Sequence, residues 1–310
     1  MSASSAPPHR RERAPARRRV RGPGGGAWGA AAAVVLADAL AGRFHRTGTA
    51  ARALLVGKPP VDRLTVVFPG FIMAAGPLGA ALEPHLRPGE GLLVVQYAER
   101  GVDIDRIAAT VMDRLRLLAP RRLDVYGASM GGMCAKQFLD RYLAAGQFCG
   151  QAGLVLDTAP ASAADLRWPT WLLASGRYYH GGPLSSAVWA LLSSLTPRPT
   201  PEPGADPVVT RRSRRHSAWA GMPAITTQAA YVEAFPPLQA GELTRTAAQV
   251  RYVRPRQSEQ DSVVRLDSAV AGWRRAFPDL RVTCVPGRKG AWHVPLVERP
   301  AELMRAIRGE

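Results

Sequence analysis

The serine at position 129 is flanked by glycines in a pattern typical of catalytic nucleophiles. Gly127-Ala128-Ser129-Met130-Gly131 fits G-x-S-x-G. In that pattern the serine sits on a sharp, strained turn between a strand and a helix, where its hydroxyl stands clear of the backbone. Glycines are needed on both sides because a Cβ there would collide with the crossing chain. Ser129 is therefore the candidate nucleophile.

The residues around this turn supply the context that such a nucleophile needs. Residues 123–126 form a short apolar strand, and residues 133–143 carry apolar side chains at helical spacing. A bare G-x-S-x-G occurs by chance in many proteins, but one between a strand and an amphipathic helix is far more specific. The alternative is a glycine-rich turn in which the serine is a bystander.

One histidine lies where a base for this serine would be expected. A serine hydroxyl is nucleophilic at neutral pH only when a neighbouring base accepts its proton. His293 lies between the last apolar strand, residues 280–285, and the last helix, residues 294–308. The other five histidines lie in basic or terminal segments, before a Pro-Gly turn, or in a long aromatic-rich insertion. We therefore expect His293 to be the base.

A catalytic histidine needs an acid that holds its tautomer. Asp261 follows the strand before the last one, after a polar loop, and we expect it to be this acid. Asp157, Glu259 and Asp267 are alternatives. Asp157 ends the apolar segment GLVLD, and the other two lie close to Asp261 along the chain.

Apolar strands alternate with amphipathic helices over most of the chain. This alternation predicts a parallel sheet with helices on both of its faces. The expected strands are residues 64–68, 92–97, 123–126, 153–157, 251–253 and 280–285, and the expected helices are residues 105–118, 133–143 and 294–308.

The alternation stops after residue 160 and resumes after residue 238, a stretch too long for a plain loop. It contains the basic run at residues 211–215 and a proline-rich linker at residues 196–207. We expect residues 161–238 to form a helical cap whose aromatic side chains line an apolar pocket, although each could instead belong to an ordinary core. These aromatics are Trp168, Trp171, Tyr178, Tyr179, Trp189 and Trp219.

The N-terminal segment is basic and then apolar. Residues 9–21 contain seven arginines against one glutamate, and we expect residues 1–26 to be a disordered Arg-rich tail. Residues 27–58 are expected to form a helical segment on the catalytic domain. The alternatives are a secretory signal with a cleavage site at residues 39–41, and attachment to a membrane surface. The apolar run of residues 27–37 is too short to span a bilayer.

Charge and cysteine content exclude several other classes of function. The net charge is +17 at pH 7, but much of it lies in the tail, and the other arginines form no basic helix interleaved with aromatics. We therefore expect no nucleic-acid partner. Cys134, Cys149 and Cys284 have no C-x-x-C or Cys/His spacing. We expect no disulfide framework, no metal site and no cofactor.

With these motifs, the chain resembles the α/β-hydrolase superfamily from about residue 64 to its C-terminus. The order Ser129, Asp261, His293 is the superfamily's order. The resemblance implies an α/β fold with a mostly parallel central sheet and an inserted helical cap. It also implies an oxyanion hole made by the backbone N–H groups of Met130 and Phe71. Residues 69–71, Pro-Gly-Phe, stand where many members have His-Gly. This departure is mild, because the oxyanion would be bound by a backbone N–H group and not by a side chain.

The resemblance predicts a core of residues 59–160 and 239–310 and hydrolysis of a small carboxylic ester or thioester through an acyl-enzyme. An amidase or other hydrolase, and a non-catalytic protein that binds membrane surfaces, are the alternatives. We expect a cytoplasmic protein. Export, and membrane association with surface contact through the Arg-rich N-terminus, are the alternatives. Substrate identity and oligomeric state stay open.

Overall fold

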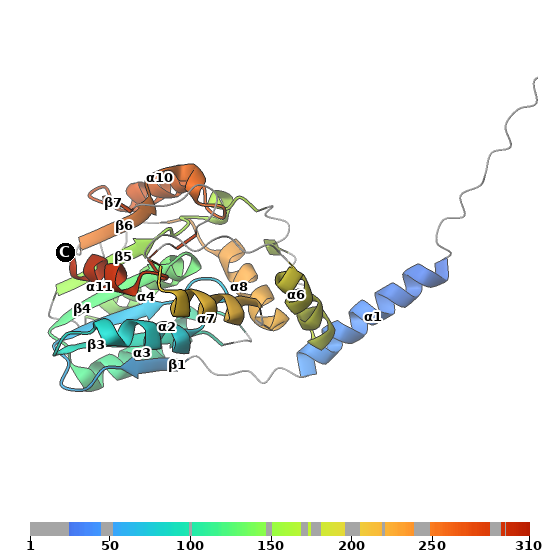
Figure 1. Cartoon of the computed structure of the whole chain (residues 1–310), viewed down its shortest axis with the longest axis horizontal. Helices are drawn as coiled ribbons and strands as arrows, with labels where there is room; N and C mark the ends of the chain where they lie inside the picture. Colours follow the sequence, from blue (N-terminus) through green and yellow to red (C-terminus); the bar gives the residue numbers. More distant parts are fainter. Residues whose placement is uncertain are drawn as a thin grey trace, which may run out of the picture. The chain divides into compact units, whose positions relative to one another are not determined.

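The computed structural model divides the chain into two compact units, Met1–Ala37 and Asp38–Glu310, and the second contains the sheet (Figure 1). The structure describes residues 25–44, 52–98, 101–146, 151–168, 173–174, 181–195, 205–218, 221–238, 249–285, 293–294 and 296–310.

A seven-stranded sheet forms the centre of the second unit, with strand order β1-β3-β2-β4-β5-β6-β7. All neighbouring strands are parallel except the edge pair, in which β1 runs antiparallel to β3. The mostly parallel sheet predicted from the sequence is thus confirmed. The strands are β1 Arg52–Val56, β2 Arg63–Phe68, β3 Glu90–Gln96, β4 Arg122–Ala128, β5 Gln151–Asp157, β6 Gln249–Pro255 and β7 Arg281–Val285.

Helices cover both faces of the sheet, as the alternating pattern predicts. On one face lie α3 (Ile104–Leu118), α4 (Met130–Ala144) and α10 (Leu266–Ala276), whose buried side chains join one apolar cluster. On the other face, α2 (Ala75–Leu82) and α11 (Pro300–Arg308) join a second cluster. The central strands are buried from both sides, which explains their nearly continuous apolar sequences.

Several helix boundaries follow from local sequence. The side chain of Asp103 accepts hydrogen bonds from the N–H groups of Asp105 and Arg106 and so caps the start of α3. The helix ends at Ala119, which has φ 42° and precedes Pro120. Helix α11 begins at Pro300, six residues later than the sequence predicted, because proline suits the first turn of a helix better than its interior.

The N-terminal segment differs from the prediction. Helix α1 covers Gly25–Phe44, and Arg52–Val56 form strand β1, so a helical segment over residues 27–58 is wrong for its last part. The first two residues of α1 belong to the expected tail, whose other residues, 1–24, lie outside the described residues. Among the helices described, none is both long enough and apolar enough to cross a bilayer.

Helices α6 (Pro183–Leu195), α7 (Pro207–Ala218) and α8 (Met222–Ala234) are inserted between β5 and β6, which confirms the predicted insertion. Helix α6 contacts both α7 and α8, and α7 lies against α2 (Figure 1). Part of the insertion, with Trp171, Tyr178, Tyr179 and Trp219, lies outside the described residues.

Candidate active site

Ser129 lies at the turn between β4 and α4, with φ 51° and ψ −123°, a strained conformation for a residue with a side chain. The flanking glycines permit this turn. A Cβ on Gly127 would lie 2.4 Å from the Cα of Gly132, and one on Gly131 would lie 2.1 Å from the carbonyl oxygen of Phe68. The strand–turn–helix context expected for Ser129 is therefore present, with its glycines required by close backbone contacts.

Three polar side chains meet at this turn, although they lie far apart in the sequence. The Nε2 atom of His293 is in direct hydrogen-bond contact with the Oγ atom of Ser129. The Nδ1 atom of the same ring lies 3.0 Å from Oδ2 of Asp261. The structure thus brings together the serine, histidine and aspartate that the sequence analysis singled out.

The backbone after β6 fixes the orientation of the Asp261 carboxylate. Its Oδ1 atom accepts hydrogen bonds from the N–H groups of Val263 and Val264, both at 2.8 Å. The side chain of Arg167 donates to the Asp261 carbonyl oxygen at 2.9 Å and ties the loop to the start of the insertion. Because Oδ1 is occupied in this way, Oδ2 is left to face the imidazole.

The alternative acids are engaged elsewhere. The Asp267 carboxylate pairs with Arg254 at 2.6 Å. In the described part of the chain, the His293 ring donates no hydrogen bond to Glu259. The side chain of Asp157 accepts a hydrogen bond from the Tyr126 hydroxyl at 2.7 Å. His293 therefore pairs with Asp261.

Asp157 is nevertheless an unusual group close to the site. Its side chain is fully buried at the end of β5, and this burial raises the pKa of its carboxyl to about 7, against the lowering effects of the Tyr126 hydrogen bond and the His293 charge. Its backbone carbonyl accepts a hydrogen bond from the Ser129 N–H at 2.9 Å. A carboxyl that holds its proton near neutrality supports the turn without adding full charge beside the histidine.

The expected oxyanion-hole residues both border the cavity next to Ser129. Met130 is the first residue of α4, where the helix dipole favours negative charge. Within the described residues, the N–H groups of Met130 and Phe71 donate to no protein group, as such a site requires. The next N–H group, that of Ile72, donates to Oε1 of the buried Gln228 on α8 at 2.6 Å.

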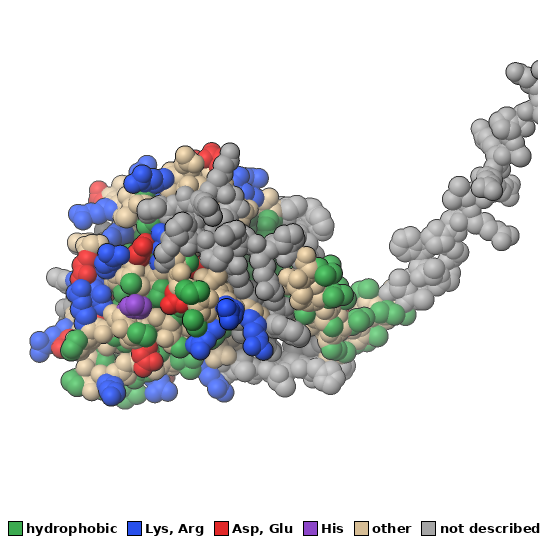
Figure 2. Space-filling model, in the orientation of Figure 1, with side chains coloured by type: hydrophobic (Ala, Val, Ile, Leu, Met, Phe, Trp, Pro, Cys, Tyr) green, Lys and Arg blue, Asp and Glu red, His purple; other side chains and the backbone are tan. Residues whose placement is uncertain are grey.

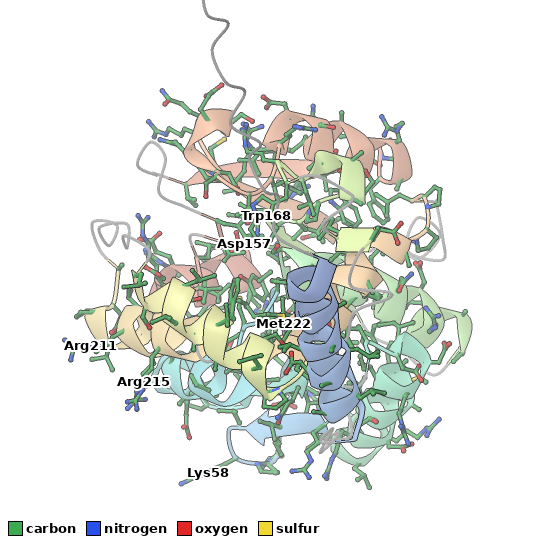
Figure 3. All side chains as sticks on the ribbon, turned by 90° about the vertical axis from the view of Figure 1, so that its right-hand side faces the viewer. Lys58, Asp157, Trp168, Arg211, Arg215 and Met222 are labelled. Atoms are coloured by element: carbon green, nitrogen blue, oxygen red, sulfur yellow. The ribbon has the colours of Figure 1, made fainter. Side chains whose placement is uncertain are left out.

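A cavity of about 280 Å³ opens beside Ser129 and His293, and its walls are mainly apolar. Trp168, labelled in Figure 3, lies edge-to-face against Phe71 with ring centroids 6.4 Å apart. Residues of the insertion thus contribute directly to the cavity. They are Leu166, Trp168, Leu173 and Val232.

Two contributors to the site were missed from the sequence. Thr158, directly after β5, has φ 48°, and its hydroxyl accepts a hydrogen bond from the Val294 N–H at 3.0 Å, which anchors the residue after His293. The position of Thr158 at the end of a predicted strand was the one feature of the sequence that could have pointed to this role. Gln228 carried no sequence signal, because its role depends on how α8 packs on the loop after β2.

Comparisons with known proteins identify the fold. No protein-family model matches the sequence, and no curated protein matches it either.

 Many solved structures match, and one of them comes from a study of carboxylesterases of the Thaumarchaeon Nitrososphaera gargenis.

That carboxylesterase structure is 10% identical to this chain with a TM-score of 0.56, and the match covers 84% of this chain and 93% of the other. The type II thioesterase BorB from the borrelidin biosynthetic cluster is 16% identical with a TM-score of 0.52, over 84% of this chain and 94% of its own. A bacterial membrane phospholipase A is 17% identical with a TM-score of 0.56, and the match covers 92% of this chain and 93% of the other. At such low sequence identities the similarity concerns the fold alone. Together with the strand order and the inserted helices, this similarity shows that the chain has the α/β-hydrolase fold.

Proposed function

We propose that this protein is a serine hydrolase that cleaves a carboxylic ester or thioester through an acyl-enzyme. The observation that carries the proposal is the continuous contact from Ser129 Oγ through the His293 ring to Asp261 Oδ2. A serine, a base and an orienting acid in this geometry form a nucleophile-activating unit.

In the first half of the reaction, Ser129 Oγ attacks the carbonyl carbon and His293 Nε2 takes the hydroxyl proton. Asp261 holds the ring so that Nδ1 carries its hydrogen, and it stabilises the imidazolium that forms. The N–H groups of Met130 and Phe71 donate to the oxyanion of the tetrahedral intermediate. His293 then returns the proton to the departing alcohol or thiol, which leaves the acyl group on Ser129.

In the second half, His293 takes a proton from water, and the resulting hydroxide attacks the acyl carbon. Collapse of the second tetrahedral intermediate expels Ser129 Oγ, which regains its proton from His293. The acid is released, and the enzyme returns to its starting state.

The apolar walls of the cavity favour an acyl group without charge. Carboxylesterase, thioesterase and phospholipase names among the structural neighbours are consistent with an ester or thioester. We therefore propose small lipophilic esters or thioesters as the substrate class.

The test is labelling with a fluorophosphonate, which reacts with activated serines. Wild-type protein should be labelled, and Ser129→Ala should not be, while circular dichroism shows the same fold. Ser194→Ala is the matched control, because this exposed serine on α6 bonds only to the Ala190 carbonyl oxygen among the described contacts and should leave labelling unchanged. Labelling that persists in Ser129→Ala would overturn the proposal.

A further inference from the structure

Helix α6 of the insertion lies on the protein surface without a single charged residue. Its sequence is PLSSAVWALLSSL, and none of its residues is buried. Surface helices of globular proteins ordinarily place charged or polar side chains toward water. This helix therefore departs from the usual pattern of a solvent-facing element.

The outward face of α6 is an apolar stripe. Leu184, Val188, Leu191 and Leu195 follow one another at helical spacing, so they share one side of the helix. Their exposed fractions are 51%, 48%, 60% and 71%. Figure 2 shows hydrophobic side chains gathered over this helix. These four residues are called the α6 stripe below.

The polar side chains of α6 include serines that turn toward the protein instead. The Ser186 hydroxyl donates to the Gly182 carbonyl oxygen at 2.8 Å and accepts a hydrogen bond from the Met222 N–H, at the start of α8, at 2.9 Å. The Ser185 hydroxyl accepts from the Gly182 N–H at 2.8 Å. In the first turn of α6 the hydroxyls of Ser185 and Ser186 are thus used within the protein, while the leucines of the stripe face outward.

The first turn of α6 is held in place by hydrogen bonds. The carboxylate of Asp38, in α1, accepts from the N–H groups of Leu184 at 2.8 Å and Ser185 at 3.1 Å. A negative charge at a helix N-terminus is favourable because of the helix dipole. The α6 stripe therefore begins on an anchored turn.

Positive charge borders the stripe. Helix α7, which contacts α6, exposes Arg211, Arg212 and Arg215, and Figure 3 shows Arg211 and Arg215 pointing outward. Neither helix contains an acidic residue, and within the described residues these three arginines form no ion pair. An apolar strip beside exposed cations matches the chemistry of an anionic lipid surface.

We propose that α6 docks the protein on a lipid bilayer that carries anionic headgroups. With 13 residues the helix is too short to cross a bilayer, so it lies in the plane of the interface with the α6 stripe in the acyl region. The arginines of α7 then meet lipid phosphates. A second copy of this chain fits less well, because a symmetric contact would bring the same arginines toward one another.

The proposal does not depend on catalysis at Ser129, so it is tested by binding. Full-length protein is sedimented with vesicles of phosphatidylglycerol and phosphatidylcholine, and separately with phosphatidylcholine alone. Val188→Gln/Leu191→Gln/Leu195→Gln should raise the lipid concentration for half-maximal binding at least about tenfold. Arg211→Gln/Arg212→Gln/Arg215→Gln should bind anionic vesicles about tenfold more weakly than the wild type, with no change on phosphatidylcholine alone. Added salt should remove this difference in affinity.

Leu117→Gln is the matched control, since Leu117 on α3 is 78% exposed but lies outside the insertion, and this variant should bind vesicles like the wild type. Unchanged vesicle binding by the α6 variant would overturn the proposal. The proposal would also be overturned if the wild type were a dimer without lipid and Val188→Gln/Leu191→Gln/Leu195→Gln made it a monomer. The α6 stripe would then be an interface between two copies of the chain.

Discussion

Asp261 is the residue whose proposed role can be separated most clearly from that of a neighbour. Asp261→Asn should lower kcat by roughly 10⁴ with the fold intact, because the amide no longer favours the required tautomer of His293. Asp157→Asn should retain most activity, because Asp157 bonds to Tyr126. Steady-state kinetics on a p-nitrophenyl ester measure both. A large loss in Asp157→Asn with little loss in Asp261→Asn would reverse the assignment.

Asp157 should make stability depend on pH. Its pKa in the folded protein, about 7, lies above the ordinary value of 3.8. Between these values the unfolded chain releases a proton that the folded chain keeps, so this group lowers stability progressively as pH rises from about 4 to 7. Asp157→Asn should remove that decline, with its largest stabilisation above pH 7. Urea unfolding at pH 5 and pH 8 measures it, and an equal effect at both pH values would contradict the prediction.

Gln228 should act as a positioning residue for the oxyanion loop. Gln228→Leu removes the acceptor for the Ile72 N–H and should lower kcat by about tenfold or more, with a smaller change in KM. Gln228→Glu keeps an acceptor oxygen and should recover much of kcat. An equal loss of kcat in both variants would show that the hydrogen bond from the Ile72 N–H to residue 228 does not position the loop.

At the residue scale, the sequence predicted the groups that carry a motif and missed those that depend on packing. Ser129 lies in a recognisable turn, and His293 and Asp261 follow strands. Gln228 reaches the Ile72 N–H from a helix 156 positions away in the sequence, and local sequence contains no trace of that contact.

At the element scale, the buried strands were predictable because they are short apolar segments. Strand β1 was not, because it is an edge strand of five residues, RALLV, that follows an apolar helix. Helix α2 was missed because its sequence, AGPLGAAL, contains two glycines and a proline, which disfavour helices. Its packing on the sheet overrides that local preference.

The inserted segment should set the acyl-length preference. Leu166, Trp168 and Leu173 line the cavity, and each methylene buried there contributes about 0.8 kcal/mol. We expect kcat/KM to rise about threefold to fourfold per methylene over short p-nitrophenyl esters and then level off. Trp168→Ala should change this dependence, while Leu117→Ala on α3 should not. A flat profile from acetyl to octanoyl would contradict an acyl-binding role.

At the scale of the whole molecule, the sheet and the proposed site lie in Asp38–Glu310. A chain lacking residues 1–24 should therefore fold and hydrolyse esters like the full chain. The deletion must spare α1, because Asp38 caps α6. Thermal unfolding and kinetics measure the outcome. A truncated protein that does not fold or turn over would show that these residues support the core.

The polar contact between Ser129 and His293 joins residues 164 positions apart, and that between His293 and Asp261 joins residues 32 apart. Neither contact survives when the sheet comes apart, so an unfolded chain holds an ordinary, unreactive serine. The extent of fluorophosphonate labelling after a short pulse is consequently a chemical gauge of the native fraction. Applied across a denaturant series, or in a crude lysate, it would count correctly assembled molecules without purification.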